Sequence, residues 1–244
     1  MKKIKTIHSS RTIMYAELEK VMDYSIDKGN FLESLQQNVT GKKSNSGIDK
    51  TAKYLKQLYG FDNNNPQFVA FKYFWKMAES SERQQITFLY AVMRDDLLAE
   101  SIGVLQSVIP GNKAAIEFFE EIIEKYHPNK YSVNTRRSMA QNIASSWKQV
   151  GFIEGKVKNI RIEPEISYRV ACFAFLLAYL DGYRADLIWN SPVVSALCLP
   201  EQNLRELAIE CSRRDLIQYQ HAGSVTVLNF TGLLNKIGID GNTN

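Results

Sequence analysis

The clearest helical pattern of the chain lies between residues 131 and 151. Its apolar positions are separated by three, four and three residues, which places them on one face of an α-helix: Ala140, Ile143, Trp147 and Val150. Either Ser132 or Asn134 is suited to cap the start of this helix, and Gly151 is suited to end it. We therefore predict a helix whose apolar stripe lies in the core.

The remaining faces of this predicted helix are polar and contain no acid. At about 100° per residue, these faces carry amide, hydroxyl, guanidinium and ammonium groups. The groups belong to Asn134, Arg137, Ser138, Gln141, Asn142, Ser145, Lys148 and Gln149. Arginine is suited to read guanine, and glutamine and asparagine are suited to read adenine, in the DNA major groove. The sequence therefore predicts a nucleic-acid contact along this face.

A short β-hairpin is predicted after Gly151. Phe152 and Ile153 lead into it, Gly155 turns, and residues 157–162 return. A helix, a tight glycine and a basic hairpin in this order are typical of the recognition helix and wing of a winged helix-turn-helix. Three basic residues of the wing are expected to contact backbone phosphates: Lys156, Lys158 and Arg161.

Positive charge is concentrated in this region. Between residues 131 and 162, six basic residues stand against one acid, a net +5, whereas the whole chain of 244 residues is +4. Phosphate binding needs such a concentration of charge on one supersecondary unit. An ordinary solvated helix on a slightly basic protein is the alternative interpretation. Arg136 lies beside the apolar stripe and is expected only to pair with a carboxylate.

A second basic helix is predicted over residues 49–59. Between residues 42 and 56 there are five lysines and one acid. The segment SGIDKTAKYLKQLYGF parallels SVNTRRSMAQNIASSWKQVGF in its polar start, its Lys-Gln pair and its Gly-Phe close. Whether these are a repeat or two amphipathic helices of similar composition stays open. The candidate phosphate contacts here are Lys42, Lys43 and Lys53, and a solvated face is the alternative.

The rest of the chain predicts further helices. They are expected over residues 12–26, 31–38, 68–78, 81–98, 99–108, 113–126, 170–183 and 200–214. Strands at 216–220 and 225–230 follow the last of them and give a second winged-helix outline. Residues 1–10 are expected to form a loose arm.

We predict three consecutive segments. Residues 1–128 form an N-terminal helical domain with a helix-turn-helix-like segment, and residues 129–164 form the winged-helix recognition helix and wing. Residues 165–244 form a C-terminal winged-helix-like segment that ends in a disordered tail after Gly238.

The sequence nominates no catalytic or metal site and no cofactor. His8, His127 and His221 are isolated from any zinc-binding spacing, and no phosphate-binding glycine loop or nucleophile elbow is found. Four acids have the spacing of a solvated helix face: Glu117, Glu120, Glu121 and Glu124. Asp95 and Asp96 are adjacent and expected on a helix surface. We predict that the protein is not an enzyme.

Composition predicts a soluble cytoplasmic protein. Apolar residues make up 45% and charged residues 23% of the chain, as in ordinary globular proteins. The three cysteines are widely spaced, which indicates free thiols in a reducing compartment. No apolar region follows the N-terminal lysines, so no signal peptide is expected. The apolar run at residues 170–180 is too short to span a membrane.

These stretches together resemble the BrxA family of bacterial BREX phage-exclusion systems. The likeness covers residues 15–165, and more weakly the segment to residue 230. It is carried by NFLESLQQNVTGKKS, TAKYLKQLYGF, FLYAVMRDDLLAESI and SVNTRRSMAQNIASSWKQVGFIEG. The resemblance implies a compact helical domain related to the antitermination factor NusB, joined to winged-helix elements, and binding of double-stranded DNA. It implies DNA contact most directly for Arg137, Gln141, Lys148 and the wing lysines.

The sequence therefore predicts a mainly α protein, a helical NusB-like bundle with winged-helix elements. Its predicted function is non-catalytic binding of double-stranded DNA in an anti-phage defence system. Other defence-system proteins and a second copy of the chain remain open as partners.

Two other functions remain open. The first is a NusB-like RNA-binding adaptor, and the second is a protein scaffold without nucleic-acid binding. A-form RNA excludes a recognition helix from its deep, narrow major groove, so a comparison of duplex DNA with RNA separates the first alternative. Co-purified nucleic acid that salt removes would argue against the second.

Overall fold

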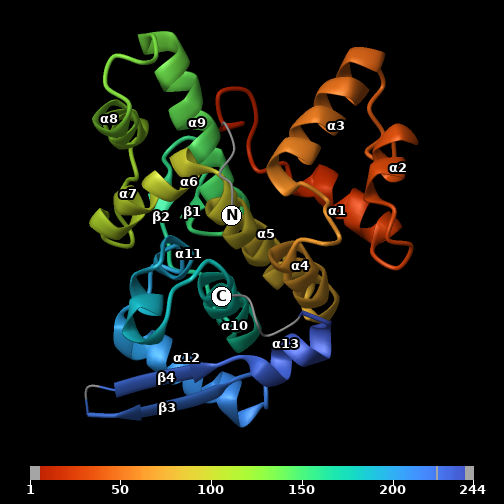
Figure 1. The fold of residues 1–244 in the computed structure, drawn as a ribbon. Helices are drawn as coiled ribbons and strands as arrows, with labels where there is room; N and C mark the ends of the chain where they lie inside the picture. Colours follow the sequence, from red (N-terminus) through yellow and green to blue (C-terminus); the bar gives the residue numbers. More distant parts are fainter. Residues whose placement is uncertain (1–5, 224, 240–244) are drawn as a thin grey trace. The chain divides into compact units, whose positions relative to one another are not determined.

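The computed structural model describes residues 6–223 and 225–239 and is mainly α-helical, with two short antiparallel hairpins (Figure 1). The predicted mainly α fold is confirmed. The chain divides into two compact units that interleave along the sequence. Among the described residues, the first unit contains 6–63 and 94–164, and the second contains 64–93 and 165–239. This division differs from the three consecutive segments 1–128, 129–164 and 165–244, because residues 64–93 pack with the C-terminal part of the chain.

Three helices form the N-terminal part of the first unit: α1 (Tyr15–Ser25), α2 (Phe31–Gln36) and α3 (Asn45–Tyr59). Helix α3 begins four residues earlier than predicted, because the Ser44 hydroxyl accepts a hydrogen bond from the Gly47 N–H at 3.1 Å. It ends at Gly60, whose φ of 73° few other residues adopt. One face of α3 is buried through Leu55 and Leu58, and the lysines lie on the other.

The remaining part of the first unit has the element order of a winged helix-turn-helix. Its helices are α6 (Asp96–Glu100), α7 (Ile102–Ser107), α8 (Ile116–Tyr126) and α9 (Val133–Gln149), and its strands are β1 (Ile153–Glu154) and β2 (Ile160–Arg161). In the hairpin, Ile153 lies opposite Arg161 and Glu154 lies opposite Ile160. Lys113, before α8, also pairs with Ile160, which extends the sheet by one bridge.

Helix α9 is the predicted recognition helix, and its predicted limits are confirmed. The N-cap is Ser132 rather than Asn134, because the Ser132 hydroxyl accepts a hydrogen bond from the Thr135 N–H at 3.3 Å. The predicted stripe is buried: Ala140, Ile143, Trp147 and Val150. The Trp147 ring packs edge-on against Phe152 with centroids 5.2 Å apart, which anchors the start of the wing in the same core.

The second unit surrounds one central apolar helix. Its elements are α4 (Pro66–Met77), α5 (Ser80–Arg94, the last residue of which belongs to the first unit), α10 (Tyr168–Leu180), the 3₁₀ helix η1 (Ala185–Asn190), α11 (Pro192–Ser195), α12 (Glu201–Arg213), β3 (Gln218–Ala222), β4 (Val225–Asn229) and α13 (Thr231–Ile237). Residues 170–178 of α10 are all buried. The Phe173 ring of α10 and the Phe74 ring of α4 have centroids 5.2 Å apart, and Phe68, Phe71, Phe74 and Trp75 of α4 are all buried in this core.

The C-terminal hairpin follows α12, as the second winged-helix outline predicted. Strands β3 and β4 pair antiparallel, with Ala222 opposite Val225. The first strand begins two residues later than predicted and includes His221 and Ala222, which were expected in the turn. Helix α13 was not predicted. The expected disordered tail includes residues 240–244, which lie outside the described residues.

The helix predicted over residues 81–98 is shorter in the structure. Helix α5 starts at Ser80, where the Glu82 carboxylate accepts a hydrogen bond from the Glu79 N–H at 2.8 Å. It ends at Arg94, because Asp95 leaves the helical path to cap α6. Within residues 6–223 and 225–239, no helix combines the length and apolar character needed to cross a bilayer.

Candidate nucleic-acid interface

The polar face of α9 forms an open stripe on the first unit. Its residues are spaced three or four apart and therefore share one side of the helix. Four are exposed, namely Asn134, Arg137, Ser138 and Gln141, and two are half-buried, namely Ser145 and Lys148. The structure thus brings six of the predicted contact residues together.

The C-terminal half of this stripe meets the wing. A cavity of about 210 Å³ lies between α9, the wing and the first residue of α8. It is lined by Ile116, Gln141, Ala144, Ser145, Lys148, Lys156, Val157 and Asn159. The Lys148 ammonium donates a hydrogen bond to the Asn159 side-chain carbonyl at 2.9 Å, which ties the helix to the wing. The recognition helix and wing therefore form one continuous surface.

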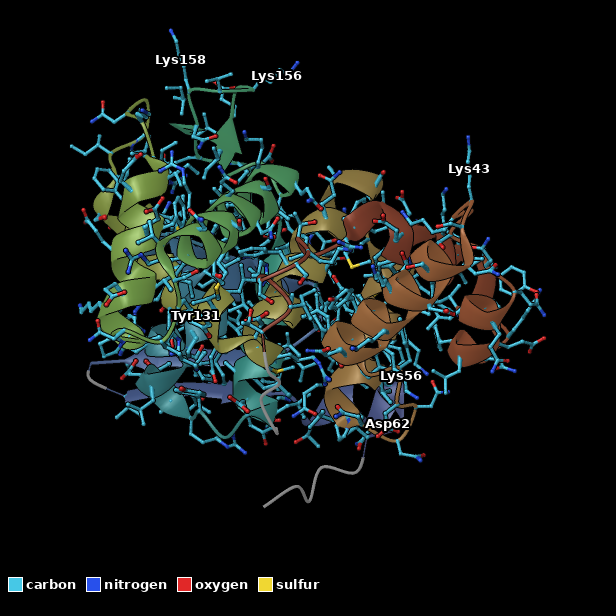
Figure 2. All side chains as sticks on the ribbon, turned by 90° about the horizontal axis from the view of Figure 1, so that it is seen from above. Lys43, Lys56, Asp62, Tyr131, Lys156 and Lys158 are labelled. Carbon is cyan, nitrogen blue, oxygen red and sulfur yellow. The ribbon has the colours of Figure 1, made fainter. Side chains whose placement is uncertain are left out.

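Exposed lysines extend this surface on the wing. Lys156 and Lys158 flank Val157, which is 82% exposed, so the tip of the wing is solvent-facing. In Figure 2 the side chains of Lys156, Lys158 and Lys43 extend toward the same side of the view, whereas Lys56 lies elsewhere. All of these lysines belong to the first unit. The wing and the loop before α3 thus present basic side chains on a common side.

Arg137 is exposed to solvent but also forms ion pairs with two acids. Its Nη1 lies 3.1 Å from Glu120 Oε1 and 3.8 Å from Glu117 Oε1, although the side chain is 53% exposed. The two acids come from α8, which packs beside α9. They were expected to be merely solvated. Arg136 pairs with Glu124 of the same helix, as predicted. A carboxylate partner therefore competes for Arg137 at the predicted base-reading position.

Arg161 was predicted to contact phosphate, and this prediction is wrong because the residue is only 2% exposed. Its Nε donates a hydrogen bond to the Leu105 carbonyl at 3.3 Å. Its guanidinium lies 5.4 Å from the centre of the Phe152 ring. Arg161 pairs with the buried Ile153 in the hairpin, and its side chain faces the core and ties β2 to α7.

Asn142 was predicted to read adenine, but its side chain is engaged elsewhere. The Asn142 Nδ2 donates a hydrogen bond of 2.8 Å to the His8 carbonyl, and the residue is half-buried. This side chain holds the N-terminal segment and does not belong to the open stripe. The helical periodicity alone could not distinguish a polar face that meets solvent from one that meets another chain segment.

The three candidate lysines near α3 are in different settings. Lys42 is paired with Glu17, with 2.7 Å between Nζ and Oε1, so its charge is partly neutralised. Lys43 and Lys53 are exposed. The N-terminal contribution to a basic surface is therefore carried by Lys43 and Lys53 rather than by Lys42.

The sequence-based prediction missed Lys113. This residue is exposed, and its backbone pairs with Ile160 beside the wing. Nothing in the local sequence around Gly111 distinguishes a strand from a loop. The signal that could have found it is the winged-helix order itself, in which the segment between α7 and α8 pairs with the wing.

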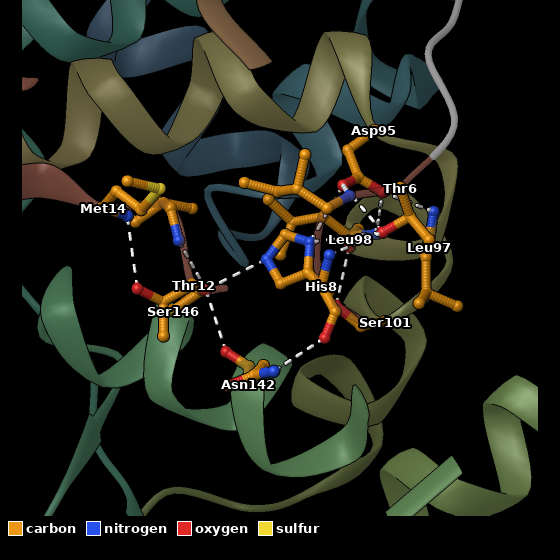
Figure 3. A network of polar contacts seen from close by, with 12 residues as sticks. Thr6, His8, Thr12, Met14, Asp95, Leu97, Leu98, Ser101, Asn142 and Ser146 are labelled. Atoms are coloured by element: carbon orange, nitrogen blue, oxygen red, sulfur yellow. Dashed lines mark hydrogen bonds and ion pairs between the residues drawn. The ribbon is translucent and has the colours of Figure 1, made fainter. Parts of the chain in front are cut away.

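A buried polar network lies behind α9, on the N-terminal segment (Figure 3). His8 Nδ1 lies 2.9 Å from Asp95 Oδ2, and His8 Nε2 lies 3.0 Å from Ser146 Oγ. Thr6 and the Ile7 N–H also donate hydrogen bonds to Asp95. Residues 6–10 are thus fastened in place, which contradicts the predicted loose arm for this part. Residues 1–5 lie outside the described residues.

An aspartate, a histidine and a serine in contact also occur in enzymes that use a serine nucleophile. Here, however, all three side chains are fully buried. The Ser146 hydroxyl additionally accepts a hydrogen bond from the Ile13 N–H at 3.1 Å and donates one to the Asn142 carbonyl at 3.0 Å. These buried hydrogen bonds stabilise the packing of the N-terminal segment against α9.

Among the residues that the structure describes, no group of three or more histidine, cysteine, aspartate or glutamate side chains is placed to hold a metal ion. The acids of α8 instead serve as ion-pair partners of α9. No family model, curated protein or solved structure matches the chain. The functional argument therefore depends on the geometry of the interface itself.

Proposed function

We propose that this chain is a non-catalytic double-stranded-DNA-binding protein that contacts the duplex through α9 and the wing of its first unit. The observation that carries the proposal is the junction of an acid-free polar helix face with an exposed basic wing around one cavity. The major groove of B-form DNA admits an α-helix, and lysines beside it meet backbone phosphates.

The distribution of charge supports the same surface. Among the described residues, the first unit (6–63 and 94–164) holds 18 basic residues and 16 acids, and the second unit (64–93 and 165–239) holds nine of each. The positive charge of the first unit is concentrated in residues 131–162, where six basic residues stand against one acid. An electrostatic attraction to nucleic acid would therefore act on the unit that contains the recognition helix.

The proposal includes a cytoplasmic location and a role in a BREX-type anti-phage system, with other defence-system proteins as partners. This part is supported by the resemblance to the BrxA family. Cys172, Cys198 and Cys211 are free thiols, which agrees with a reducing compartment.

The test is a fluorescence-anisotropy titration of labelled duplex DNA at several salt concentrations, repeated with double-stranded RNA of the same sequence. We expect binding to DNA, weaker binding to RNA, and a linear fall of log affinity with log salt. Equal or tighter binding to RNA would favour the adaptor function. No duplex binding even at about 50 mM salt would reject the proposal in favour of a protein scaffold.

A further inference from the structure

We propose that the cavity between α9 and the wing is a binding site for one phosphate group, organised around the Lys148 ammonium. Where that phosphate belongs to the DNA backbone, this inference rests on the proposed function and gives it a specific anchor point. The shared chemistry is a tetrahedral phosphate oxyanion, either an internucleotide phosphodiester or a free phosphate.

The first support is that Lys148 is held in place before any ligand arrives. Its Nζ donates to Asn159 Oδ1 at 2.9 Å, and Asn159 is only 7% exposed. The backbone of Asn159 is itself fixed, because its carbonyl accepts the Ala114 N–H at 2.8 Å. Asn159 has a φ of 52°, a left-handed conformation that asparagine adopts more readily than most residues. A lysine positioned in this way loses less freedom on binding than a free surface lysine.

The second support is the chemistry of the lining. Lys148 and Lys156 supply two ammonium groups, Ser145 supplies a hydroxyl, and Gln141 supplies a carboxamide. All four are hydrogen-bond donors, and none of the eight lining residues is acidic. Donors and positive charge without a competing carboxylate are what a phosphate oxyanion requires.

The third support is size and access. The cavity measures about 210 Å³, many times the roughly 10–15 Å³ that one water needs on the same measure, so it has room for a phosphate group. It lies where the exposed stripe of α9 reaches the wing, so a phosphate that follows the helix surface can enter it. Lys158, in contrast, extends from the tip of the wing (Figure 2) and is not part of the lining.

The first arm of the test needs no DNA. The full chain is titrated with inorganic phosphate at constant ionic strength, with chloride as the control, and backbone amide shifts are followed by NMR. We expect saturable shifts at Gln141, Ser145, Lys148 and Asn159 that chloride does not reproduce. They should disappear in Lys148→Ala and persist in Lys158→Ala.

The second arm uses duplex DNA without terminal phosphates. Lys148→Ala and Lys158→Ala remove the same charge, so generalised attraction predicts equal losses. The proposed site predicts about a 10-fold loss for Lys148→Ala and about a 2-fold loss for Lys158→Ala. Asn159→Gly keeps the charge and suits the left-handed backbone, but it frees Lys148. This variant should bind about 3-fold more weakly with an unchanged salt slope. Melting temperatures verify that each variant is folded.

The outcomes separate this inference from the proposed function. Duplex binding with equal losses for the two lysine variants and no saturable phosphate shifts would overturn the site and leave DNA binding intact. Saturable phosphate shifts in a protein that binds no duplex would support the site, with free phosphate as the ligand, and reject DNA binding. Saturable shifts together with unequal losses would support both.

Discussion

The indole nitrogen of Trp147 donates a hydrogen bond of 2.8 Å to the Ser101 hydroxyl, and this bond joins α9 to the residue between α6 and α7. Both residues are fully buried. The Ser101 hydroxyl in turn donates to the Leu98 carbonyl at 2.6 Å. Trp147 therefore anchors the buried face of α9 to the core with its indole N–H paired, and the polar face of the helix stays exposed.

Trp147→Ala should lower the free energy of unfolding by about 3–5 kcal/mol, because it leaves a large cavity and removes the hydrogen bond that the buried Ser101 hydroxyl accepts. Trp147→Phe keeps most of the apolar volume and should cost less. Urea unfolding followed by circular dichroism measures both. A Trp147→Ala protein with unchanged stability but lost nucleic-acid binding would instead identify Trp147 as a base-stacking platform.

The Lys156→Ala/Lys158→Ala double variant should weaken binding to every duplex by a similar factor. Each phosphate contact contributes roughly −0.9 to the slope of log affinity against log salt, so the slope should flatten by up to about 2. Lys76→Ala/Lys236→Ala removes the same charge from two exposed lysines of the second unit and should leave the slope unchanged. Equal effects of the two double variants would show that net charge, and not the wing, governs binding.

Glu120→Gln should raise duplex affinity about two- to fivefold, because it releases Arg137 from its ion pair and removes a negative charge from the interface. Glu121→Gln changes an exposed acid of the same helix and is the matched control.

Arg137→Ala should weaken binding to a preferred duplex sequence by about 1–3 kcal/mol more than binding to a random one, because a base-reading arginine contributes only at its preferred base. Anisotropy titrations with the two duplexes measure the difference.

Selection from a random duplex library should return a short or degenerate motif. With Asn142 holding the N-terminal segment, Arg137 and Gln141 are the side chains of the stripe best suited to bidentate base contacts. Most of the remaining groups on this surface are better suited to phosphate. A long, sharply defined consensus would contradict this arrangement.

Acid should destabilise the protein through Asp95. Burial alone would raise the pKa of this carboxyl, but the charge of His8 and the hydrogen bonds from His8, Thr6 and the Ile7 N–H outweigh it, so the pKa lies below its usual value. The unfolded chain has the ordinary value of about 3.9. The stabilisation is therefore complete above about pH 4 and is lost as pH falls through the lower folded-state pKa.

Urea unfolding between pH 6 and pH 2 measures this dependence. Asp95→Asn should cost about 1–3 kcal/mol at neutral pH and should remove part of the acid sensitivity. Asp49→Asn changes an exposed aspartate of α3 and should unfold like the unaltered protein. An Asp95→Asn protein with the full acid sensitivity would show that other carboxylates account for it.

The features predicted best from the sequence are those that local periodicity controls, namely the helix limits and the buried positions of a helix. Helix α9 has a strong apolar period and a capping serine, so its limits and the burial of Trp147 could be read directly. The hairpin followed from Gly151 and Gly155, both of which have positive φ. The exposure of Lys156 and Lys158 follows from their place at the turn of the wing.

Tertiary partners set the rest, and periodicity does not reveal them. Arg161 faces inward because its strand pairs with Ile153, and Asn142 is covered because residues 6–14 return to α9. The spacing of the acids in α8 indicated that Glu120 is solvated, whereas in the structure its carboxylate pairs with Arg137 of the neighbouring α9. Asp95 appeared to continue a helix because its partner His8 lies 87 residues away in the sequence.

The interleaved path of the chain sets an order for folding during synthesis. Helix α4 leaves the ribosome roughly a hundred residues before α10, the helix against which Phe71 and Phe74 pack. Until α10 appears, these rings lack Phe173, although Phe71 can already stack on Tyr90 of α5. The side of α4 that α10 covers is then exposed apolar surface of the kind that chaperones bind. A fragment that stops at residue 164 would keep this side exposed. The first unit is therefore best studied in the full-length chain. A truncated chain would still contain residues 64–93, which lie in the sequence between the two segments of the first unit, and their apolar side chains would stay exposed.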